Sequence, residues 1–256
     1  MCLIVLAWRP GHAQPLLLAA NRDEFYARPS QPLGEWPDAP GLFAGRDLEA
    51  GGTWLGIGPG GRFAALTNIR DPGQAAGTRS RGKLPVDFLR GELSALDFLQ
   101  RLEGQCGQYS GFNLLCGDAR QLCHFSSLER RARVLPGGIY GLSNAGLDTP
   151  WPKLQRAKAA LAARLHDPRP DRLLELLADP TQAADSQLPQ TGIGLAGERL
   201  LSSVFIASPS YGTRASSVLI IDAEGNRLLI ERSFGCNGGY LGEVRLECGV
   251  ADACAL

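Results

Sequence analysis

Two apolar runs near the N-terminus predict the first pair of strands. Residues 2–8 (CLIVLAW) and 16–21 (LLLAAN) are apolar on successive positions, and residues 9–15 (RPGHAQP) between them have the composition of a turn. A strand with one solvated face alternates between apolar and polar residues, whereas a strand covered on both faces is apolar throughout. The chain is therefore expected to open with a hairpin that is buried on both faces.

The rest of the chain alternates groups of strands with pairs of helices. One helix is expected from Pro85, a favourable residue for a first turn, and a second from Ser94, which with Asp97 resembles a capping box. Two more helices are expected over residues 151–165 and 171–178. Further strands are predicted at 52–57, 63–68, 111–117, 121–126, 201–206, 215–222, 226–232 and 239–246, and loops at 26–41 (which holds four prolines) and 180–198.

This order of elements predicts a single domain over residues 1–256 with an α+β fold. Helix pairs are segregated from hairpin-joined strands, which is typical of mainly antiparallel sheets with helices packed on them. Two sheets stacked between two layers of helices would cover both faces of each sheet and so explain the lack of alternation. We therefore expect a four-layer αββα sandwich.

Composition excludes several classes of function. Lys plus Arg and Asp plus Glu number 26 each, so the net charge is zero and no basic surface for nucleic acid is expected. No stretch reaches the roughly 20 apolar residues that span a bilayer, and the apolar start lacks the basic segment of a signal peptide. We expect a cytoplasmic protein with no nucleic-acid partner and no transmembrane segment.

The cysteines and histidines do not predict a metal site. The seven cysteines are odd in number and form no CxxC pair, so neither a disulfide framework nor a structural zinc site is expected, and most should be small core residues. His12, His124 and His166 are far apart and lack the spacing of metal ligands. No metal site and no required cofactor are predicted, and haem stays open only as a carried ligand with one of these histidines as an axial ligand.

Cys2 is the first candidate for chemistry. Methionine aminopeptidases remove Met1 when the second residue is small, and removal would leave a cysteine as the first residue. Its α-amino group would have a pKa near ~7.7–8.0, so one residue would carry both a nucleophilic thiol and a base close to neutral pH. The alternative is that Cys2 is simply a small apolar residue of the first strand.

The segment Asn21-Arg22-Asp23-Glu24 is the second candidate. It ends an apolar strand, and alternation in a strand places Asn21 and Asp23 on one face and Arg22 and Glu24 on the other. If the first two strands pair through the 9–15 turn, Asp23 comes close to the α-amino group of Cys2 and can hold it for proton transfer. The alternative is a solvated polar turn with a surface ion pair of little energetic weight.

Asn68 and Asn144 are candidate donors for a developing oxyanion. Each ends an apolar segment, where a side chain can project into a cleft, and acyl transfer needs donors aimed at the position where negative charge develops. The alternative for each is an ordinary turn asparagine.

Together these motifs carry a family resemblance. The start MCL, the NRDE tetrapeptide, GGTWLG at 51–56 and LTN at 66–68 resemble the NRDE family, the family of the transport and Golgi organisation protein two homologues. Gly141-Leu142-Ser143-Asn144 and Gly212-Thr213-Arg214 are similar to it as well, so the resemblance runs along the whole chain. It implies the αββα fold of N-terminal nucleophile hydrolases and a link to the bile-salt hydrolase and penicillin V acylase group.

The resemblance also implies roles for individual residues. Cys2 matches the nucleophile, Asp23 the carboxylate beside it and Asn144 the oxyanion-hole asparagine, with Asn68 as a second donor, and Arg214 is similar to a late active-site arginine. The acylase group has an arginine three residues before the aspartate, where this chain has Ala20. The charge around the thiol is therefore expected to differ from that group's.

Two functions from different classes stay open. The first is a cysteine amidohydrolase that acts on a C–N bond of a small acyl or amide ligand through Cys2 and the 21–24 segment, with Asn21, Arg22 and Glu24 as ligand-binding residues. The second is a non-enzymatic carrier, for which the resemblance implies haem trafficking, lipid homeostasis or acyl-CoA binding in the same cleft. In that case Cys2 either ligates iron or has no chemical role. Either one predicts a small-molecule ligand.

Overall fold

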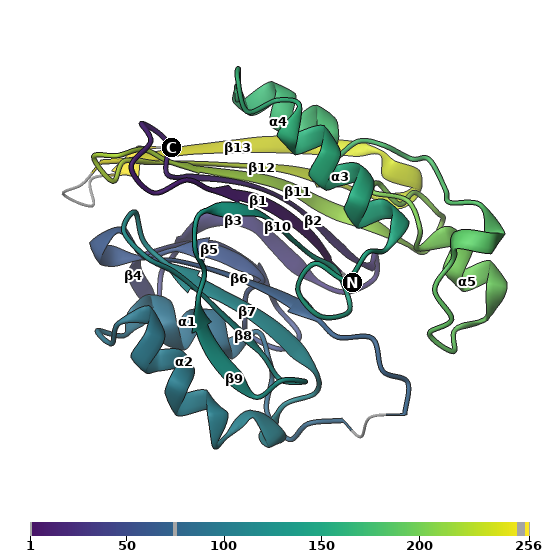
Figure 1. The fold of residues 1–256 in the computed structure, drawn as a ribbon, viewed down its shortest axis with the longest axis horizontal. Helices are drawn as coiled ribbons and strands as arrows, with labels where there is room; N and C mark the ends of the chain where they lie inside the picture. The colour runs from purple at the N-terminus through teal and green to yellow at the C-terminus, as the bar shows by residue number, and fades with distance from the viewer. Residues whose placement is uncertain (1, 74–75, 250–253, 256) are drawn as a thin grey trace.

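Two antiparallel sheets form the centre of the molecule (Figure 1). The computed structural model describes residues 2–73, 76–249 and 254–255, and residues 2 and 255 by their backbone alone. In this part of the chain each sheet has seven strands. Sheet A has the order β10 (Gly138–Leu142), β1 (Cys2–Trp8), β2 (Leu16–Phe25), β11 (Tyr211–Ile221), β12 (Arg227–Phe234), β13 (Tyr240–Cys248) and β14 (Cys254–Ala255). Sheet B has the order β3 (Ser30–Trp36), β4 (Ala39–Asp47), β5 (Leu55–Ile57), β6 (Phe63–Asn68), β7 (Phe112–Gly117), β8 (Leu122–Ser126) and β9 (Arg131–Val134).

Helices cover the outer face of each sheet, so the four-layer αββα sandwich predicted from the sequence is confirmed (Figure 1). Helices α1 (Lys83–Arg90) and α2 (Ala95–Glu103) pack on sheet B, and α3 (Pro152–Ala162) and α4 (Pro170–Leu176) on sheet A. A central apolar layer lies between the sheets, and two further layers lie beneath the helices. Because every central strand has an apolar layer on both sides, its sequence does not alternate.

The opening hairpin forms as predicted, and its second strand is longer than expected. β1 and β2 pair in antiparallel register from Cys2 opposite Arg22 to Trp8 opposite Leu16. β2 continues to Phe25 because β11 pairs with it on its other side, from Tyr211 opposite Phe25 onwards. The 21–24 segment therefore lies inside a strand, at the end of β2 that extends beyond the start of β1.

The prediction of a loop over residues 26–41 is wrong, because β3 and the start of β4 occupy most of it. β3 is an edge strand of sheet B, and its pairing with β4 is irregular between Gln31 and Gly34, around Pro32. Edge strands and bulges are the places where a sheet tolerates proline, since no ladder hydrogen bond is lost there. The prolines therefore mark an irregular edge of the sheet.

One other predicted strand is absent, and some observed strands were not predicted. The 201–206 segment is not a strand; a short helix, α5 (Gly194–Leu200), occupies the end of the expected loop and leads into it. The strands β9 and β10 were not predicted, because their residues are half exposed at sheet edges and lack an apolar run. By contrast, the cap at Ser94 is confirmed, since its Oγ accepts a hydrogen bond from the backbone N–H of Asp97 at 3.1 Å.

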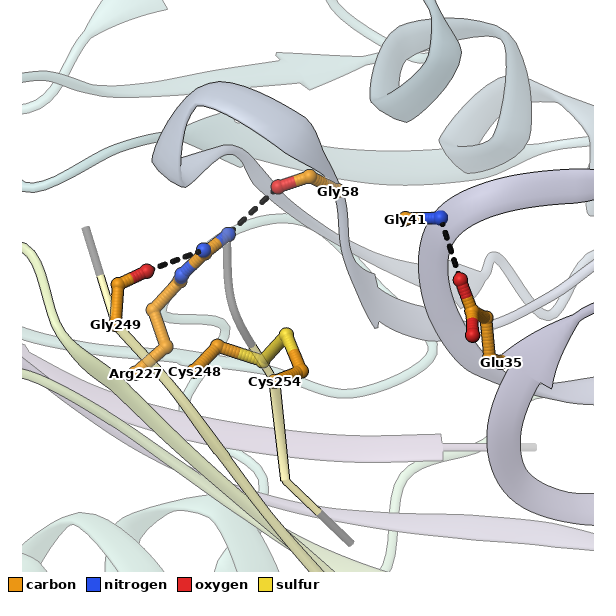
Figure 2. Close-up of a disulfide and its surroundings, with 7 residues drawn as sticks. All are labelled: Glu35, Gly41, Gly58, Arg227, Cys248, Gly249 and Cys254. Carbon is orange, nitrogen blue, oxygen red and sulfur yellow. Dashed lines mark hydrogen bonds between the residues drawn. A yellow bond between two sulfur atoms is a disulfide. The ribbon is translucent and has the colours of Figure 1, made fainter. Parts of the chain in front are cut away.

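A disulfide joins Cys248 and Cys254, which corrects the expectation that the cysteines would stay unpaired (Figure 2). It links β13 to the short strand β14. Beside it, the buried Arg227 of β12 donates from Nη1 to the carbonyl of Gly58 at 2.6 Å and so ties sheet A to a turn of sheet B (Figure 2). The irregular cysteine spacing could not reveal the pair, because the antiparallel pairing of β13 with β14 is what brings these two residues together.

Helices that the structure describes are all too short or too polar to cross a membrane.

Candidate functional site

The candidate site lies where β2 extends past the start of β1. The register pairs Cys2 with Arg22, so Asp23 is the next residue along β2, beyond the last paired residue of β1. Alternation within the segment is as predicted: Asn21 reaches the end of α4 and Asp23 bonds to Thr213 of β11, whereas Arg22 faces the space between the sheets. The side chain of Cys2 is outside the described part of the structure, so the site is described from the residues around it.

Asp23 is a buried carboxylate held at the end of β2. Its side chain is 1% exposed, and its Oδ1 accepts a hydrogen bond from Thr213 Oγ1 at 2.8 Å, across from it on β11. Burial raises the pKa of Asp23, and the positive charge of Lys153 is the strongest described influence that lowers it again. A carboxylate in this position must be stabilised by neighbouring cations and donors if it is to stay ionised.

Lys153 is a residue of the site that the sequence reasoning missed. It lies in the first turn of α3 and is only 1% exposed. The signal was present in the sequence, because Lys153 lies one turn before Ala157 on the face that also carries Leu154 and Leu161. Lysine is almost never fully buried unless it is paired, so its position on an apolar helix face points to an anionic partner.

Asn21 joins β2 to the end of α4, to the segment after α5 and to β11. Its Nδ2 donates to the carbonyls of Leu177 and Val204, each at 2.9 Å, and its Oδ1 accepts from Ser216 Oγ at 2.6 Å. These groups are buried, and a buried polar group without a partner costs stability. The amide of Asn21 is thus engaged inside the protein, at the end of α4, and a role in ligand binding stays a prediction.

Arg22 and Glu24 lie on the opposite face of β2. The guanidinium of Arg22 stacks on the Trp54 ring at 4.2 Å, donates to Ser30 Oγ at 3.0 Å and lies 3.5 Å from Asp47 Oδ2. Glu24 is half buried, and its Oε1 accepts from the N–H of Phe25 at 2.9 Å. Arg22 is therefore a fixed part of the wall on this side of the strand.

Two cavities share the Arg22–Trp54 stack as part of their lining. The first, of about 330 Å³, is also lined by Asp23, Asn68 and Arg81. The second, of about 280 Å³, is lined on its other sides by residues that include Arg214, Glu231, Phe234 and Leu241. The first cavity brings Asp23 and Asn68, from two different sheets, to one space.

The structure brings the two candidate oxyanion asparagines together. Asn144 Nδ2 donates to the backbone carbonyl of Asn68 at 2.8 Å, and Asn144 is 1% exposed while Asn68 is half buried at the end of β6. The buried Asn113 of β7 holds both segments, because its Nδ2 donates to Thr67 Oγ1 at 3.1 Å and to the carbonyl of Ala145 at 2.7 Å. The side-chain amide of Asn113 therefore holds Thr67 and Ala145, the residues next to Asn68 and Asn144 in the chain.

Arg214 lies at the same end of sheet A, in an irregularity of β11. The register between β11 and β2 shifts between Thr213 and Ala215, so Arg214 is the extra residue. Such a bulge re-aims a side chain. Its Nη1 donates to the carbonyls of Phe25, Tyr26 and Arg28 at 3.0, 3.1 and 2.9 Å. Arg214 therefore holds the turn that follows β2, in addition to lining the second cavity.

Glu231 of β12 is a second buried carboxyl that the sequence reasoning missed. It is 4% exposed; Oε1 accepts from the N–H of Leu33 at 2.8 Å and Oε2 from Ser217 Oγ at 3.4 Å. Burial raises the pKa of Glu231 to about 7, against the opposing influence of the Leu33 N–H, Arg22 and Ser217. The signal in the sequence is a carboxylate two residues after Leu229, on the face that packs between the sheets.

Stability is expected to fall as Glu231 ionises. Its pKa rises from 4.5 to about 7 on folding, so the folded chain holds a proton that the unfolded chain releases. The stabilisation that the protonated Glu231 carboxyl contributes is complete below its unfolded pKa of 4.5. It is lost as the pH rises through about 7, and the loss amounts to about 3 kcal/mol. Urea unfolding across this range should show a decline in wild type that Glu231→Gln removes. Glu247→Gln serves as the control, because Glu247 is 64% exposed. A decline in Glu231→Gln as large as that in wild type would contradict the assignment of the pH dependence to Glu231.

Two solved structures resemble the arrangement of the chain. A Caenorhabditis elegans N-acylethanolamine-hydrolyzing acid amidase ortholog matches with a TM-score of 0.47 and 12% identity, over 85% of this chain and 92% of that one. A C2A mutant of the conjugated bile acid hydrolase from Clostridium perfringens matches with a TM-score of 0.42 and 9% identity, over 89% of this chain and 88% of that one.

Sequence relatives match over nearly the full length. The Transport and Golgi organization protein 2 homologs of Bos taurus and Homo sapiens are each 36% identical, over 91% of this chain and 93% of theirs. The Drosophila melanogaster Transport and Golgi organization protein 2 is 29% identical, over 91% of this chain and 92% of its own. The family model described as Transport and Golgi organisation 2 matches residues 1–236. The chain therefore belongs to the Transport and Golgi organisation 2 family, as the NRDE motif and the segments around it predicted.

Proposed function

We propose that the protein is an N-terminal cysteine amidohydrolase that cleaves a small acyl amide bound in the cavity beside Asp23. The observation that carries this proposal is the position of Asp23: a carboxyl that is 1% exposed and lies on β2 directly beyond the residue paired with Cys2. A cationic α-amino group next to this carboxylate would offset the cost of burying its charge. Removal of Met1 would create that group at Cys2.

The proposed reaction uses these positions. The thiol of Cys2 passes its proton to its own α-amino group and attacks the amide carbonyl, forming a C–S bond and an oxyanion. The resulting ammonium, held by Asp23, protonates the leaving nitrogen as the C–N bond breaks. Water then attacks the thioester carbonyl and passes a proton to the free α-amino group. The C–S bond breaks, the acid is released, and the ammonium returns that proton to the departing thiolate.

Amide donors for the oxyanion would come from Asn68 and Asn144. Asn68 lines the cavity, and the hydrogen bond from Asn144 to its carbonyl keeps the two residues adjacent. Preorganised donors cost no reorganisation when the charge develops, which is why such groups contribute strongly to acyl transfer. The support from Asn113 would maintain this arrangement.

A carrier whose ligand occupies the second cavity, across the Arg22–Trp54 stack, is the second candidate, and one observation favours it. The second cavity is lined by Phe234 and by Leu241, which is 69% exposed, so an apolar surface leads from solvent toward Arg22. An acyl chain of a lipid or of acyl-CoA would bury that surface. A haem carrier would have to ligate iron through another residue type, since none of the three histidines lines either cavity.

One set of measurements separates the two functions. The purified protein is incubated with a panel of N-acyl p-nitroanilides that differ in acyl length, and release of p-nitroaniline is followed by absorbance. The amidohydrolase proposal predicts steady multiple-turnover release with at least one acyl length. No release across the panel, together with saturable binding of haemin or of a fluorescent acyl-CoA, would contradict hydrolysis and support the carrier.

A further inference from the structure

Charge is distributed unevenly around the first cavity. At the ends of β2 and β4 its lining includes the carboxyls of Asp23, Glu24 and Asp47, and Asp47 Oδ2 lies 2.7 Å from Arg28 Nε. Another part of the lining is the segment 77–82 (GTRSRG), which carries two arginines, two hydroxyl groups and no acidic residue. The cavity therefore has acidic groups at the strand ends and only basic charge along this segment.

The segment that carries the two arginines is fixed by close backbone contacts near both of its ends. The N–H of Gly77 donates to Ser110 Oγ at 2.9 Å, and a Cβ on Gly77 would lie 2.4 Å from the backbone nitrogen of Ser110. The carbonyl of Gly82 accepts from the N–H of Thr53 at 2.9 Å, and a Cβ on Gly52 would lie 2.3 Å from the carbonyl carbon of Gly82. Only glycine allows these approaches, so the segment forms a preorganised wall that loses little freedom when a ligand binds.

Arg81 lies in this wall, close to the candidate oxyanion residue Asn68. Its side chain is half buried, and its Nη1 donates to the carbonyl of Gly111 at 3.0 Å. The same carbonyl accepts from the N–H of Ile69, the residue after Asn68, at 2.9 Å. Both Arg81 and Asn68 line the first cavity. The guanidinium of Arg81 is therefore held beside the strand end that carries Asn68.

The other arginine of the segment, Arg79, is held by a different part of the chain. Arg79 is exposed, its guanidinium lies over the ring of Tyr109 at 5.2 Å, and its Nη1 donates to Gln108 Oε1 at 3.3 Å. A guanidinium presents its N–H donors in a planar fork that matches the oxygen atoms of a carboxylate or a phosphate. Arg81 is thus the arginine of this wall that is best placed to meet such a group next to Asn68.

We propose that the amide substrate carries an oxyanionic group, a carboxylate or a phosphate, and that Arg81 binds this group in the first cavity. The hydroxyls of Ser80 and Ser110, which also line the cavity, are further donors for it. This inference rests on the proposed amidohydrolase function and names the class of its substrate: a small acyl amide with negative charge close to the scissile bond. Arg81 is in this account a residue that determines specificity and takes no part in proton transfer.

Binding to the Cys2→Ala variant tests this substrate class without turnover. Three anilides with the same acyl group are compared by isothermal titration calorimetry: N-acyl 4-aminobenzoate, N-acyl 4-aminophenyl phosphate and the neutral N-acyl 4-aminobenzamide. At least one anion should bind about tenfold or more tightly than the benzamide, because a hydrogen bond between charged groups is stronger than a neutral one. The tighter of the two anions identifies the group as carboxylate or phosphate. Equal affinity for all three compounds would overturn the proposal.

Substitution of Arg81 tests whether this residue causes the preference. Arg81→Met in the Cys2→Ala background should lower the affinity for the anion to that for the benzamide. The affinity for the benzamide should stay unchanged, which also shows that the cavity is intact. Arg90→Met is the matched control, because Arg90 is exposed in the last turn of α1, and it should keep the full preference. A preference for the anion that survives in Arg81→Met would overturn the assignment.

Arg81→Lys covers the case in which Arg81→Met fails to fold. The lysine keeps the positive charge but cannot form the paired hydrogen bonds of a guanidinium. Its affinity for the anion should therefore fall severalfold, while the affinity for the benzamide stays the same. Full affinity for the anion in Arg81→Lys would contradict recognition by the guanidinium.

Hydrolysis of the same three anilides separates this inference from the proposed function. In the parent, the preferred anion should have the higher kcat/KM through a lower KM, and Arg81→Met should raise that KM with little change in kcat. Absence of hydrolysis together with selective binding of the anion would overturn the proposed function and leave the ligand class as stated. Hydrolysis of all three anilides with equal kcat/KM would overturn the ligand class and leave the proposed function.

Discussion

Replacing Cys2 with alanine is expected to lower kcat/KM for amide hydrolysis by about 10³-fold or more, because the reaction loses the nucleophile that forms the thioester. The α-amino group and Asp23 remain, so binding of the substrate should change little and the loss should fall on kcat. Initial rates of p-nitroaniline release over a range of substrate concentrations measure both constants. Stability should change by less than about 1 kcal/mol, since the substitution is small and lies at the end of a strand.

The matched control is Cys236→Ala, which removes the exposed free cysteine among the described residues. It should retain the kinetics of the parent. Cys2→Ser keeps a weaker nucleophile and should fall between the parent and Cys2→Ala. Equal rates in Cys2→Ala and the parent would show that another group performs the attack or that the release is not enzymatic.

Asp23→Asn is expected to lower kcat/KM by about 10²–10⁴-fold, because an amide cannot hold and stabilise the ammonium that forms during proton transfer. It should also cost about 1–3 kcal/mol of stability, since the buried hydrogen bond from Thr213 Oγ1 loses its charged acceptor. Kinetics are therefore measured at a temperature and urea concentration where unfolding curves show the variant to be fully folded. The loss should again appear in kcat.

Asp171→Asn is the control for Asp23→Asn, because Asp171 lies on α4 over the same sheet and is 86% exposed. It should change neither stability nor rate. A folded Asp23→Asn protein with the kcat of the parent would show that Asp23 serves the structure alone.

The layers of the fold could be predicted because they follow from local patterns. The unbroken apolar runs of β1 and β2 predicted cover on both faces, and the capping box at Ser94 predicted the start of a helix. The edge strands β3, β9 and β10 were missed, since prolines and half-exposed residues are tolerated at an edge and give no periodic signal.

The faces on which site residues lie could be predicted only on the first two strands. Alternation alone placed Asp23 and Arg22 on opposite faces, as observed. Lys153 and Glu231 come from distant elements, and their role depends on which strands and helices meet. The direction of the Arg214 side chain depends on a bulge in β11, and no residue pattern in the chain predicts that bulge.

The identity of the first residue tests the central claim most directly. The protein is purified, treated with less than one equivalent of iodoacetamide at neutral pH, digested and analysed by peptide mass spectrometry. The account predicts that the N-terminal peptide begins at Cys2 and carries the carbamidomethyl group ahead of Cys236. A peptide that begins at Met1, or a label found on Cys236 first, would contradict it.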